Sequence, residues 1–481
     1  MLFNSIEFLL FLPLVFIGYW LLAKSRLVYQ NLLLLLASYV FYGWWDYRFL
    51  ALIVASTVID YAVGLRLAQA KEKRVRKRWL WVSVAFNLGL LGFFKYYNFF
   101  VESWIDAFAS IGYQLDPWTI SVILPVGISF YTFQTMSYSL DIYKGQLEPT
   151  HDFIGFAAFV AFFPQLVAGP IERASNLLPQ ILKKRQFKYP QAVQGCRQIL
   201  WGFFKKIVIA DALAPSVNEI FAHYSDYSSG TLLLGAFYFS LQIYCDFSGY
   251  SDIAIGTAKL FGIELMTNFR FPYFSRSIGE FWRRWHISLS TWFRDYVYIP
   301  LGGSKVDKGL AIRNVFIVFL VSGLWHGANW TFVCWGLIHA LLFVPSFILG
   351  TNRKVYSTWN WPTISRGNVA DIGRILGVFL LVMLSWVFFR ADSINHAFAY
   401  LGGIFEGSYS QLPFYNPYDH QTMGFEHLTI ALFILFEIML CNQIPGKTSR
   451  VLRWSAYCIA VIFIVTSIQL NSSVPFIYFQ F

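Results

Sequence analysis

One histidine in a long uncharged stretch is the first residue in the sequence that could do chemistry. His326 lies in Leu324-Trp-His-Gly-Ala-Asn-Trp330, and no Asp, Glu, Lys or Arg occurs between Asn314 and Gly350. An ionisable group inside a membrane is costly to bury and is by default a functional candidate. A neutral imidazole can take a proton from a hydroxyl and return it to a leaving group. From the pattern alone, a histidine that hydrogen-bonds between packed helices explains His326 equally well.

The neighbours of His326 could help to hold a substrate. Gly327 leaves space beside the imidazole, and Asn329 or Trp330 could orient or donate a hydrogen bond to a bound molecule. Trp325, on the other side of the histidine, is a further candidate for substrate contact. His339 belongs to the same uncharged stretch but has no motif around it, so we expect it to serve packing.

A second histidine, His286, lies among cations and aromatic residues. The flanking set is Arg283, Arg284, Trp285 and Arg294. One interpretation is an interfacial belt, because Trp, Tyr and Arg favour the headgroup depth of a bilayer. The other is a cationic mouth for a phosphate-bearing donor, because the arginine fork matches phosphate oxygens. In the second case His286 would line that mouth or assist a base.

Two further places carry reactive groups. Asp246 and Asp252 lie at the predicted end of an apolar run, where they could pair with arginines or orient a catalytic group. The chain ends on Pro475-Phe-Ile-Tyr-Phe-Gln-Phe481, whose single phenol is Tyr478. An aromatic tail is typical of an interfacial anchor, but an apolar terminus could also enter a cavity and present its hydroxyl there.

The composition indicates what must position these residues. Of 481 residues, 57% are hydrophobic, 20% are aromatic and 13% are charged, whereas a soluble domain carries about 25% charged residues. Apolar runs long enough for a spanning helix, about 17–25 residues, recur from end to end. The sequence therefore predicts an all-α polytopic membrane protein in a lipid bilayer.

The charge and cysteine patterns exclude other classes. The net charge of +11 comes mostly from loops between apolar runs, where the excess of cations on one side of a membrane accounts for it. We therefore expect no nucleic-acid partner. The five cysteines are scattered and form no Cys/His cluster, which predicts neither disulfides nor a metal site.

The expected topology follows from the basic run Lys71–Arg78, read as a cytoplasmic loop. Counting spans from this loop places both termini outside the cytoplasm. If the runs 120–140 and 153–169 both crossed the membrane fully, the next basic loop would lie outside the cytoplasm. One of them is therefore expected to be re-entrant or half-length. Irregular backbone at membrane depth occurs only where protein buries it or where it lines a cavity. This region therefore indicates an internal chamber. The expected spans before the basic run are 8–23, 28–44 and 49–65.

The second half of the chain contains less regular predicted segments. Residues 231–247 are expected to form one span, and the arginine-rich segment 264–313 to form amphipathic and re-entrant helices at the cytoplasmic face. Residues 315–348 are too long for one comfortable span. They are expected to form a tight hairpin that turns near Asn329–Val333, with His326 and His339 at comparable depth.

Taken together, several motifs resemble the membrane-bound O-acyltransferase family, in its bacterial branch that acetylates polysaccharides. The motifs that carry the resemblance are Leu36–Tyr42, Leu124–Tyr131, Phe163–Pro170, Tyr244–Asp252, Asn268–Tyr273, Phe281–Gly303, Leu324–Gly327 and the terminal Phe476–Phe481. The resemblance implies a bundle of about 11–13 transmembrane or re-entrant helices around a central tunnel. Its expected parts are N-terminal helices (1–110), a catalytic core (111–350) and C-terminal helices with the aromatic tail (351–481).

The resemblance also implies a reaction. The donor would be acetyl-CoA, bound at the cytoplasmic mouth without a metal, and the acetyl group would be delivered to the outer side. The family's hallmark histidine falls on His326, which would act as general base, and its second histidine falls on His286. In related D-alanylation systems a separate small protein ends in a motif similar to the terminal one here. Its fusion to this chain argues against D-alanyl transfer and makes Tyr478 a candidate acetyl carrier.

The implied setting is the inner membrane of a bacterium, with an extracytoplasmic acetyltransferase of the SGNH class as partner and a polysaccharide as acceptor. Two alternatives remain open. One is a lipid or protein O-acyltransferase with the same core. The other is a non-catalytic polysaccharide channel or scaffold in which the histidines are structural.

Overall fold

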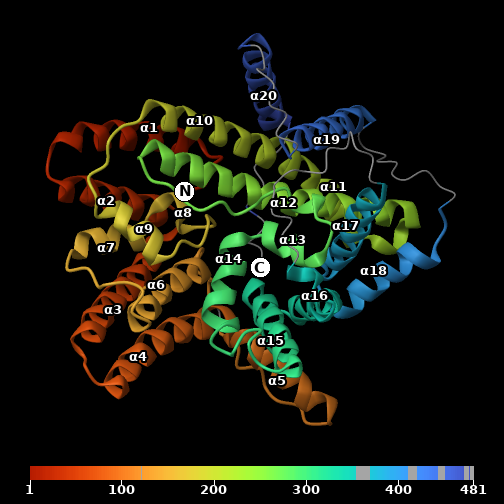
Figure 1. Cartoon of the computed structure of the whole chain (residues 1–481). Helices are drawn as coiled ribbons and strands as arrows, with labels where there is room; N and C mark the ends of the chain where they lie inside the picture. The colour runs from red at the N-terminus through yellow and green to blue at the C-terminus, as the bar shows by residue number, and fades with distance from the viewer. Residues whose placement is uncertain (121, 354–368, 410–419, 442–449, 471–475, 477–481) are drawn as a thin grey trace. The chain divides into compact units, whose positions relative to one another are not determined.

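The computed structural model describes residues 1–481 except 121, 354–368, 410–419, 442–449, 471–475 and 477–481 (Figure 1). Every regular element in the described part of the chain is a helix. A membrane-embedded chain must satisfy its backbone N–H and C=O groups internally, and a helix does so within one segment. The prediction of an all-α polytopic protein is confirmed.

The described residues form two compact units. The first comprises residues 1–199 and 251–266. Its helices are α1 (Ile6–Leu21), α2 (Leu27–Asp46), α3 (Leu50–Gln69), α4 (Lys73–Leu91), α5 (Tyr97–Ser110), α6 (Ile128–Tyr143), α7 (Phe153–Val160), α8 (Phe163–Leu166), α9 (Ala174–Ile181) and most of α10 (Tyr189–Phe203). Its core contains a buried carboxylate, Asp60 of α3, which accepts hydrogen bonds from Ser83 and Asn87 of α4 and from Ser139 of α6.

The second unit comprises residues 200–250 and 267–481 and holds the histidines singled out by the sequence. Its helices are α11 (Asp211–Ala222), most of α12 (Ser229–Leu260), α13 (Ile278–Arg284), α14 (Ile287–Phe293), α15 (Lys308–His326), α16 (Trp330–Ile348), α17 (Val369–Arg390), α18 (Ile394–Glu406), α19 (His420–Cys441) and α20 (Arg450–Leu470). Two π-helical segments also belong to it, Phe204–Ala210 and Arg294–Tyr298. Such segments are frequent at functional sites.

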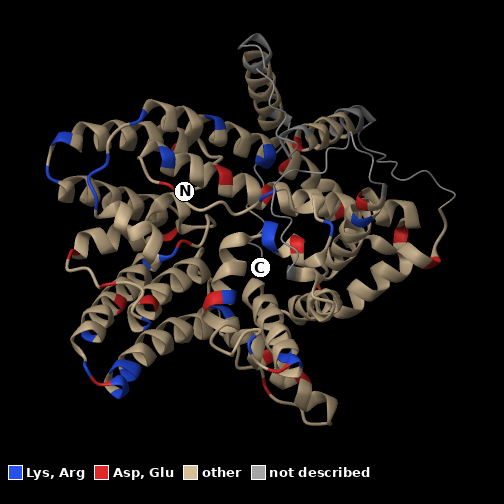
Figure 2. Cartoon of the chain, in the orientation of Figure 1, with Lys and Arg blue, Asp and Glu red and all other residues tan. Residues whose placement is uncertain are grey.

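Six helical stretches in the described residues are long and apolar enough to cross a membrane. They are Ile6–Lys24, Leu27–Gln69, Lys73–Ser110, Lys308–His326, Trp330–Ile348 and Ala370–Arg390. Figure 2 shows most helix bodies free of charge, with cations gathered at places such as the start of α4. The chain is therefore a multi-pass membrane protein. The count of about 11–13 helices, the central tunnel, the orientation of the termini and the three expected parts of the chain stay predictions.

Three predicted boundaries were wrong. The run Lys71–Arg78 is not a loop, because α4 already begins at Lys73 and its exposed Lys and Arg side chains are good helix formers. The span expected over 231–247 continues as α12 to Leu260. Of residues 120–140, only those from Ile128 onward are helical.

The second run of the pair that broke the parity is also short. Residues 153–169 form two pieces, the eight-residue α7 and the four-residue α8. The eight residues of α7 rise about 12 Å, well short of a bilayer core of about 30 Å. Such short pieces agree with the expectation that one of the two runs is half-length.

Candidate active site

Helices α15 and α16 form the predicted hairpin and pack backbone to backbone. A methyl group added at Gly336 would overlap the carbonyl oxygen of Phe319, and one added at Gly323 would overlap that of Phe332. The two glycines are therefore the point of closest approach, where only a hydrogen side chain fits. This crossing lies one turn before His326 on α15, so it fixes the position of that imidazole.

The turn of the hairpin lies earlier than predicted, at residues 327–329 rather than near Asn329–Val333. Gly327 is extended and ends α15, and Asn329 caps α16 by accepting a hydrogen bond from the Thr331 N–H at 2.9 Å. His326 is therefore the last residue of α15, whereas His339 lies in the middle of α16. The prediction that both lie at comparable depth was wrong.

The surroundings of the turn also differ from the sequence expectation. The space beside Gly327 is filled by the Phe332 ring, because a methyl group at Gly327 would overlap that ring. Gly327 thus leaves room for a neighbouring side chain and not for a substrate. The amide nitrogen of Asn329 donates to the Asp392 carbonyl at 3.1 Å. Both the oxygen and the nitrogen of the Asn329 side chain are therefore hydrogen-bonded to backbone groups of this chain.

His326 is almost completely buried in a wall of aromatic rings. Its side chain is 2% exposed, and its ring centroid lies 5.1 Å from that of Trp325, 5.1 Å from Trp335 and 5.4 Å from Phe389. The second histidine, His286, lies on the remaining side with its ring centroid at 6.3 Å. The structure thus brings together two imidazoles that are 40 residues apart in sequence.

His286 occupies a strained backbone position between α13 and α14. Its φ of 42° is left-handed, a conformation that residues other than glycine rarely adopt and that collects at functional sites. A backbone clamp holds it there. The Arg270 N–H donates to the Arg284 carbonyl at 2.9 Å, and the Ile287 N–H donates to the Asn268 carbonyl at 2.9 Å. The segment 268–270 thus fixes the chain on both sides of His286.

The tautomer of His286 can be read from its partner. The Oδ1 atom of Asn268 accepts from the backbone N–H of Ser288 at 3.2 Å. A backbone nitrogen can only donate, so this atom must be the amide oxygen. The same oxygen lies 3.1 Å from Nδ1 of His286, so Nδ1 carries the hydrogen. Burial without a charged partner lowers the pKa of His286 to about 3, and the neutral ring therefore keeps a bare Nε2.

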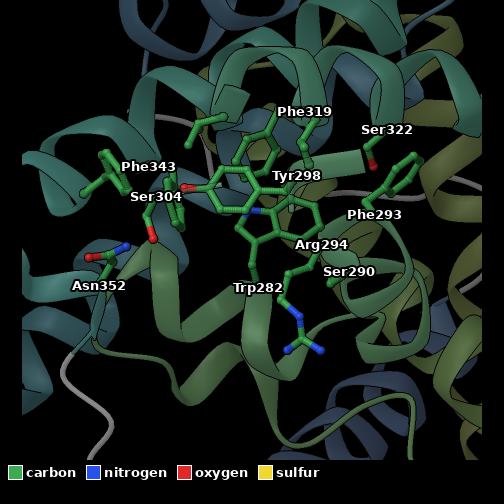
Figure 3. A pocket seen from close by; sticks show the side chains of 13 residues that line it. Trp282, Ser290, Phe293, Arg294, Tyr298, Ser304, Phe319, Ser322, Phe343 and Asn352 are labelled. Carbon is green, nitrogen blue, oxygen red and sulfur yellow. The ribbon is translucent and has the colours of Figure 1, made fainter. Parts of the chain in front are cut away.

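A cavity of about 350 Å³ is lined by residues of the helices that flank this pair, α13, α14, α15 and α16, and of the segments that follow α14 and α16 (Figure 3). Aromatic rings form most of its wall, with Trp282 in the middle of the view and Tyr298, Phe319 and Phe343 around it. The polar side chains on the wall are Ser290, Arg294, Ser304, Ser322 and Asn352, with the hydroxyl of Tyr298 and the indole N–H of Trp282. A mainly apolar cavity with a few placed polar groups is the usual form of a small-molecule site.

The cavity leads toward His326 along one face of α15. Val315, Phe319 and Ser322 line it at the spacing of successive helical turns. The next residue on that face is His326, one turn beyond Ser322. On the partner helix, Phe343 and Phe347 line the cavity and the same face continues through His339 to Trp335, which touches His326. Neither histidine lines the cavity, but the helix faces that form its wall continue to His326.

The cationic set around His286 divides into two kinds. Arg294 and Arg283 are exposed. Arg294 lines the cavity, and its guanidinium points away from the rings in Figure 3. Arg283 donates to the carbonyl of Asn352, another lining residue, at 2.7 Å. Arg294 also pairs with its neighbour Asp295 at 2.7 Å.

The other two members of the set are inside the protein. Arg284 forms a largely buried ion pair with Glu280 at 2.6 Å, and Arg276 shares that carboxylate. The four-residue spacing of that pair is a helical signal that the sequence contained. Trp285 is completely buried, with its ring 5.0 Å from Phe269 and 4.9 Å from Trp386. It shapes the wall behind His286.

The two acids singled out by the sequence lie inside α12 and have separate partners. Asp246 forms a buried ion pair with Lys206 at 2.7 Å, and the same lysine binds Asp211 at 2.7 Å. Asp246 thus pairs with a lysine among the described residues, whereas the sequence had suggested arginines. The residue after it, Phe247, stands edge-on to His286 with ring centroids 4.5 Å apart. Asp252, in the other unit, accepts from Gln198 at 2.9 Å.

The C-terminal tail reaches the same region. Phe476 is 1% exposed, and its ring lies 5.0 Å from Tyr250 and 5.8 Å from Phe247. Phe247 in turn touches His286, so one ring separates the tail from the second histidine. Tyr478 lies outside the described residues.

One residue near the site, Asn268, was missed from the sequence. It occurred only as part of a motif, and no local pattern connects it with a histidine 18 residues away. His339, which was expected to serve packing, bonds a neighbouring helix. Its neighbour Ser385 gives its hydrogen to the Val382 carbonyl at 2.6 Å and therefore accepts from Nε2 of His339 at 3.0 Å. Nδ1 of His339 has no hydrogen-bond partner in the described part of the chain.

Within the described ranges, no three or more His, Cys, Asp and Glu side chains gather where they could hold a metal ion.

Comparison with known proteins gives this geometry its context. The sequence model of the membrane-bound O-acyltransferase family matches residues 34–387. A probable alginate O-acetylase of Pseudomonas aeruginosa is 42% identical, over 90% of this chain and 81% of that protein. A probable alginate O-acetylase of Pseudomonas putida is 39% identical over the full length of both chains. A peptidoglycan O-acetyltransferase of Helicobacter pylori is 37% identical, over 84% of this chain and 80% of that protein.

These matches confirm the resemblance that the motifs indicated, and they favour an enzyme over a non-catalytic channel or scaffold. The family model covers the whole α15–α16 hairpin, both facing histidines and the cavity. The chain belongs to the membrane-bound O-acyltransferase family and is an acyltransferase.

Proposed function

We propose that this enzyme moves an acetyl group from acetyl-CoA to a hydroxyl of an extracytoplasmic polysaccharide, either an alginate-like exopolysaccharide or a cell-wall glycan. The names of its relatives, alginate O-acetylases and a peptidoglycan O-acetyltransferase, support this acceptor class. The observation that carries the proposal is the placement of His326. It faces His286 and ends the helix face whose earlier residues line the cavity.

The cavity suits the acetyl-pantetheine arm of the donor. A volume of about 350 Å³ is at the lower end of the roughly 300–1,000 Å³ typical of ligand sites. The arm would fill it, and the phosphates of the nucleotide would stay at the polar side. Arg294 and Arg283 lie there with exposed guanidinium groups that can bind phosphate oxygens. Arg284 is left out of this role because it is largely buried in its ion pair with Glu280.

The reaction needs one base and one leaving group. Neutral His326 takes the proton of the attacking hydroxyl, whose oxygen forms a bond to the thioester carbonyl carbon. The tetrahedral intermediate then breaks its carbon–sulfur bond. His326 returns the proton to the sulfur, so that coenzyme A leaves as the thiol. The aromatic wall of Trp325, Trp335 and Phe389 keeps water away from this exchange.

The attacking hydroxyl in the first step is assigned to Tyr478. Phe476 anchors the tail one ring away from His286, and two further residues can span at most about 7 Å. Tyr478 would receive the acetyl group as a phenyl ester. An extracytoplasmic partner of the SGNH class would then transfer it to the polysaccharide. This relay requires a multi-pass protein in the bacterial inner membrane with its C-terminus on the outer side.

The test is label transfer from radiolabelled acetyl-CoA to purified protein. Wild type should hydrolyse or transfer the acetyl group and retain label. His326→Ala should lose turnover, and Tyr478→Phe should lose the retained label. Retained label in Tyr478→Phe would move the carrier elsewhere, and turnover without retained label would favour direct transfer.

Two further results would overturn the donor assignment. One is the absence of turnover in wild type even with partner and acceptor present. The other is a clear preference for a long-chain acyl-CoA, which would favour the alternative of a lipid or protein O-acyltransferase.

A further inference from the structure

Asn268 bonds the residues around His286 through both its backbone and its side chain. Its backbone carbonyl accepts from the N–H of Ile287, and its Oδ1 accepts from the N–H of Ser288 at 3.2 Å and from the Ser288 hydroxyl at 2.9 Å. The same Oδ1 is the acceptor for Nδ1 of His286. The residue is completely buried, as is the histidine. One residue therefore fixes the positions of the loop before α14, of the first turn of α14 and of the His286 ring.

The opposite nitrogen of His286 faces a different situation. Nε2 has no hydrogen-bond partner among the described residues, although the side chain is 0% exposed. A buried polar atom without a partner is costly and calls for an explanation in terms of function. The titratable side chain in ring contact with His286 is His326. On the α12 side, Asp246 pairs with Lys206, and Asp211 shares that lysine.

The spacing of the two rings indicates what Nε2 can accept. A direct N–H···N bond would bring the centroids to about 5 Å, because its donor–acceptor distance is about 3 Å. At the observed 6.3 Å the rings are too far apart for a direct bond, so a bridging oxygen is needed. A single water can accept from an N–H of His326 and donate to Nε2 of His286. With such a bridge, His326 carries its hydrogen on the nitrogen that donates to the water, and its other nitrogen is bare.

We propose that Asn268 is a positioning residue for acyl transfer: by fixing His286 as the Nδ1–H tautomer, it makes Nε2 the acceptor that orients the base His326. In this arrangement the base His326 acts on the hydroxyl, His286 orients the base, and Asn268 orients His286. A base oriented by a further group is common in nucleophilic catalysis. When His326 takes the hydroxyl proton, the neutral His286 accepts a hydrogen bond from the resulting imidazolium. No proton is lost or gained by Asn268 or His286. The inference rests on the proposed role of His326 as base.

The tautomer can be measured without any substrate. Protein labelled with ¹⁵N-histidine in lipid nanodiscs gives separate signals for protonated and bare ring nitrogens. His286→Gln identifies the signals of this ring by their loss. Wild type should show His286 with Nδ1–H and bare Nε2, and Asn268→Leu should lose this pattern. An Nε2–H or doubly protonated His286 in wild type would overturn the proposal, whatever the donor or the acceptor.

Turnover of acetyl-CoA then tests the consequence. Asn268→Leu should lower kcat by about 10–100-fold, as loss of an orienting partner does, with little change in KM. Asn268→Asp keeps an oxygen acceptor and should restore kcat to within tenfold of wild type by about the same reasoning. Its carboxylate also stabilises protonated His286, so the acidic limb of the kcat profile should move to higher pH. A purely structural role would not move that limb.

Controls separate this proposal from misfolding and from failure of the proposed function. Thr291→Val removes a hydroxyl of α14 that donates only to the Ser288 carbonyl in the described structure, and should behave as wild type. Melting temperatures show whether each variant is folded. If wild type turns over acetyl-CoA and folded Asn268→Leu does the same at the wild-type rate, Asn268 does not position the base. If wild type does not turn over acetyl-CoA, the proposed function fails while the ¹⁵N result still stands.

Discussion

The glycine contact between α15 and α16 gives the sharpest test of how the site is held. A methyl group at Gly336 would overlap the Phe319 carbonyl oxygen and lie 3.1 Å from the carbonyl carbon. Both atoms belong to the backbone of α15, which cannot rotate away as a side chain could. Gly336→Ala must therefore push the two helices apart at the point where their backbones meet.

The size of the effect follows from this geometry. Carbon atoms in contact are separated by about 3.5–4.0 Å, so relief of the overlap requires a shift of about 1 Å. The shift acts about two turns from His326 on α15 and next to Trp335, which touches it. A misplacement of about 1 Å at a reacting group costs about 100-fold in rate, or about 2.7 kcal/mol of transition-state stabilisation. Overpacking should also lower stability by about 1–3 kcal/mol.

The assay is kcat for acetyl-CoA turnover, with the melting temperature of the same detergent-purified protein measured alongside. Gly323→Ala makes the reciprocal clash with the Phe332 carbonyl and should give the same result. Gly309→Ala is the matched control, because it adds the same methyl group to α15 where no atom lies within 4 Å. It should leave kcat unchanged and raise helix stability slightly, by about 1 kcal/mol.

A Gly336→Ala protein with the wild-type kcat and melting temperature would refute this reasoning. It would mean that the helices do not meet at these glycines, and the positions of His326 and the cavity wall would then need another basis.

Three further predictions concern the cavity and two buried carboxyl groups. Ser322→Trp should fill the inner cavity and raise KM for acetyl-CoA at least about tenfold. The indole would clash with the bound donor and remove about 1.4 kcal/mol or more of its binding energy. An unchanged KM would show that the donor binds elsewhere. Asp60→Leu should lower the melting temperature markedly, because it leaves three buried donors without an acceptor at about 1–3 kcal/mol each, whereas Asp60→Asn should be milder. Burial raises the pKa of Glu172 to about 7 despite hydrogen bonds from Met266 and Asn176. The folded state therefore holds a proton between the ordinary pKa of 4.5 and 7 that the unfolded state has lost. Stability should fall as the pH rises through this window, and Glu172→Gln should remove that slope in melting temperatures measured from pH 4 to 8.

Much of the fold was predictable because membrane helices are decided locally. Each spanning segment satisfies its own backbone and displays its own apolar surface, so composition alone predicted the helices and the 315–348 hairpin. His326 was found for the same reason: an imidazole stands out where every neighbour is uncharged. Boundaries were less predictable. Asp246 looked like the end of a span because an unpaired charge is costly inside a membrane helix. In the folded protein Lys206 pairs with it, so the helix continues.

What the sequence could not predict depends on pairs that only folding brings together. The hydrogen position on His286 is set by Asn268, 18 residues away, and its ring neighbour His326 is 40 residues away. The ring contact at the C-terminal end joins Phe476 to Phe247, two residues that lie far apart in the sequence. The sequence alone therefore determined a membrane-embedded helical acyltransferase with one conspicuous histidine. The tertiary structure decided which groups face that histidine and which of their nitrogens are bare, because hydrogen bonds and ring contacts depend on distance in space and not along the chain.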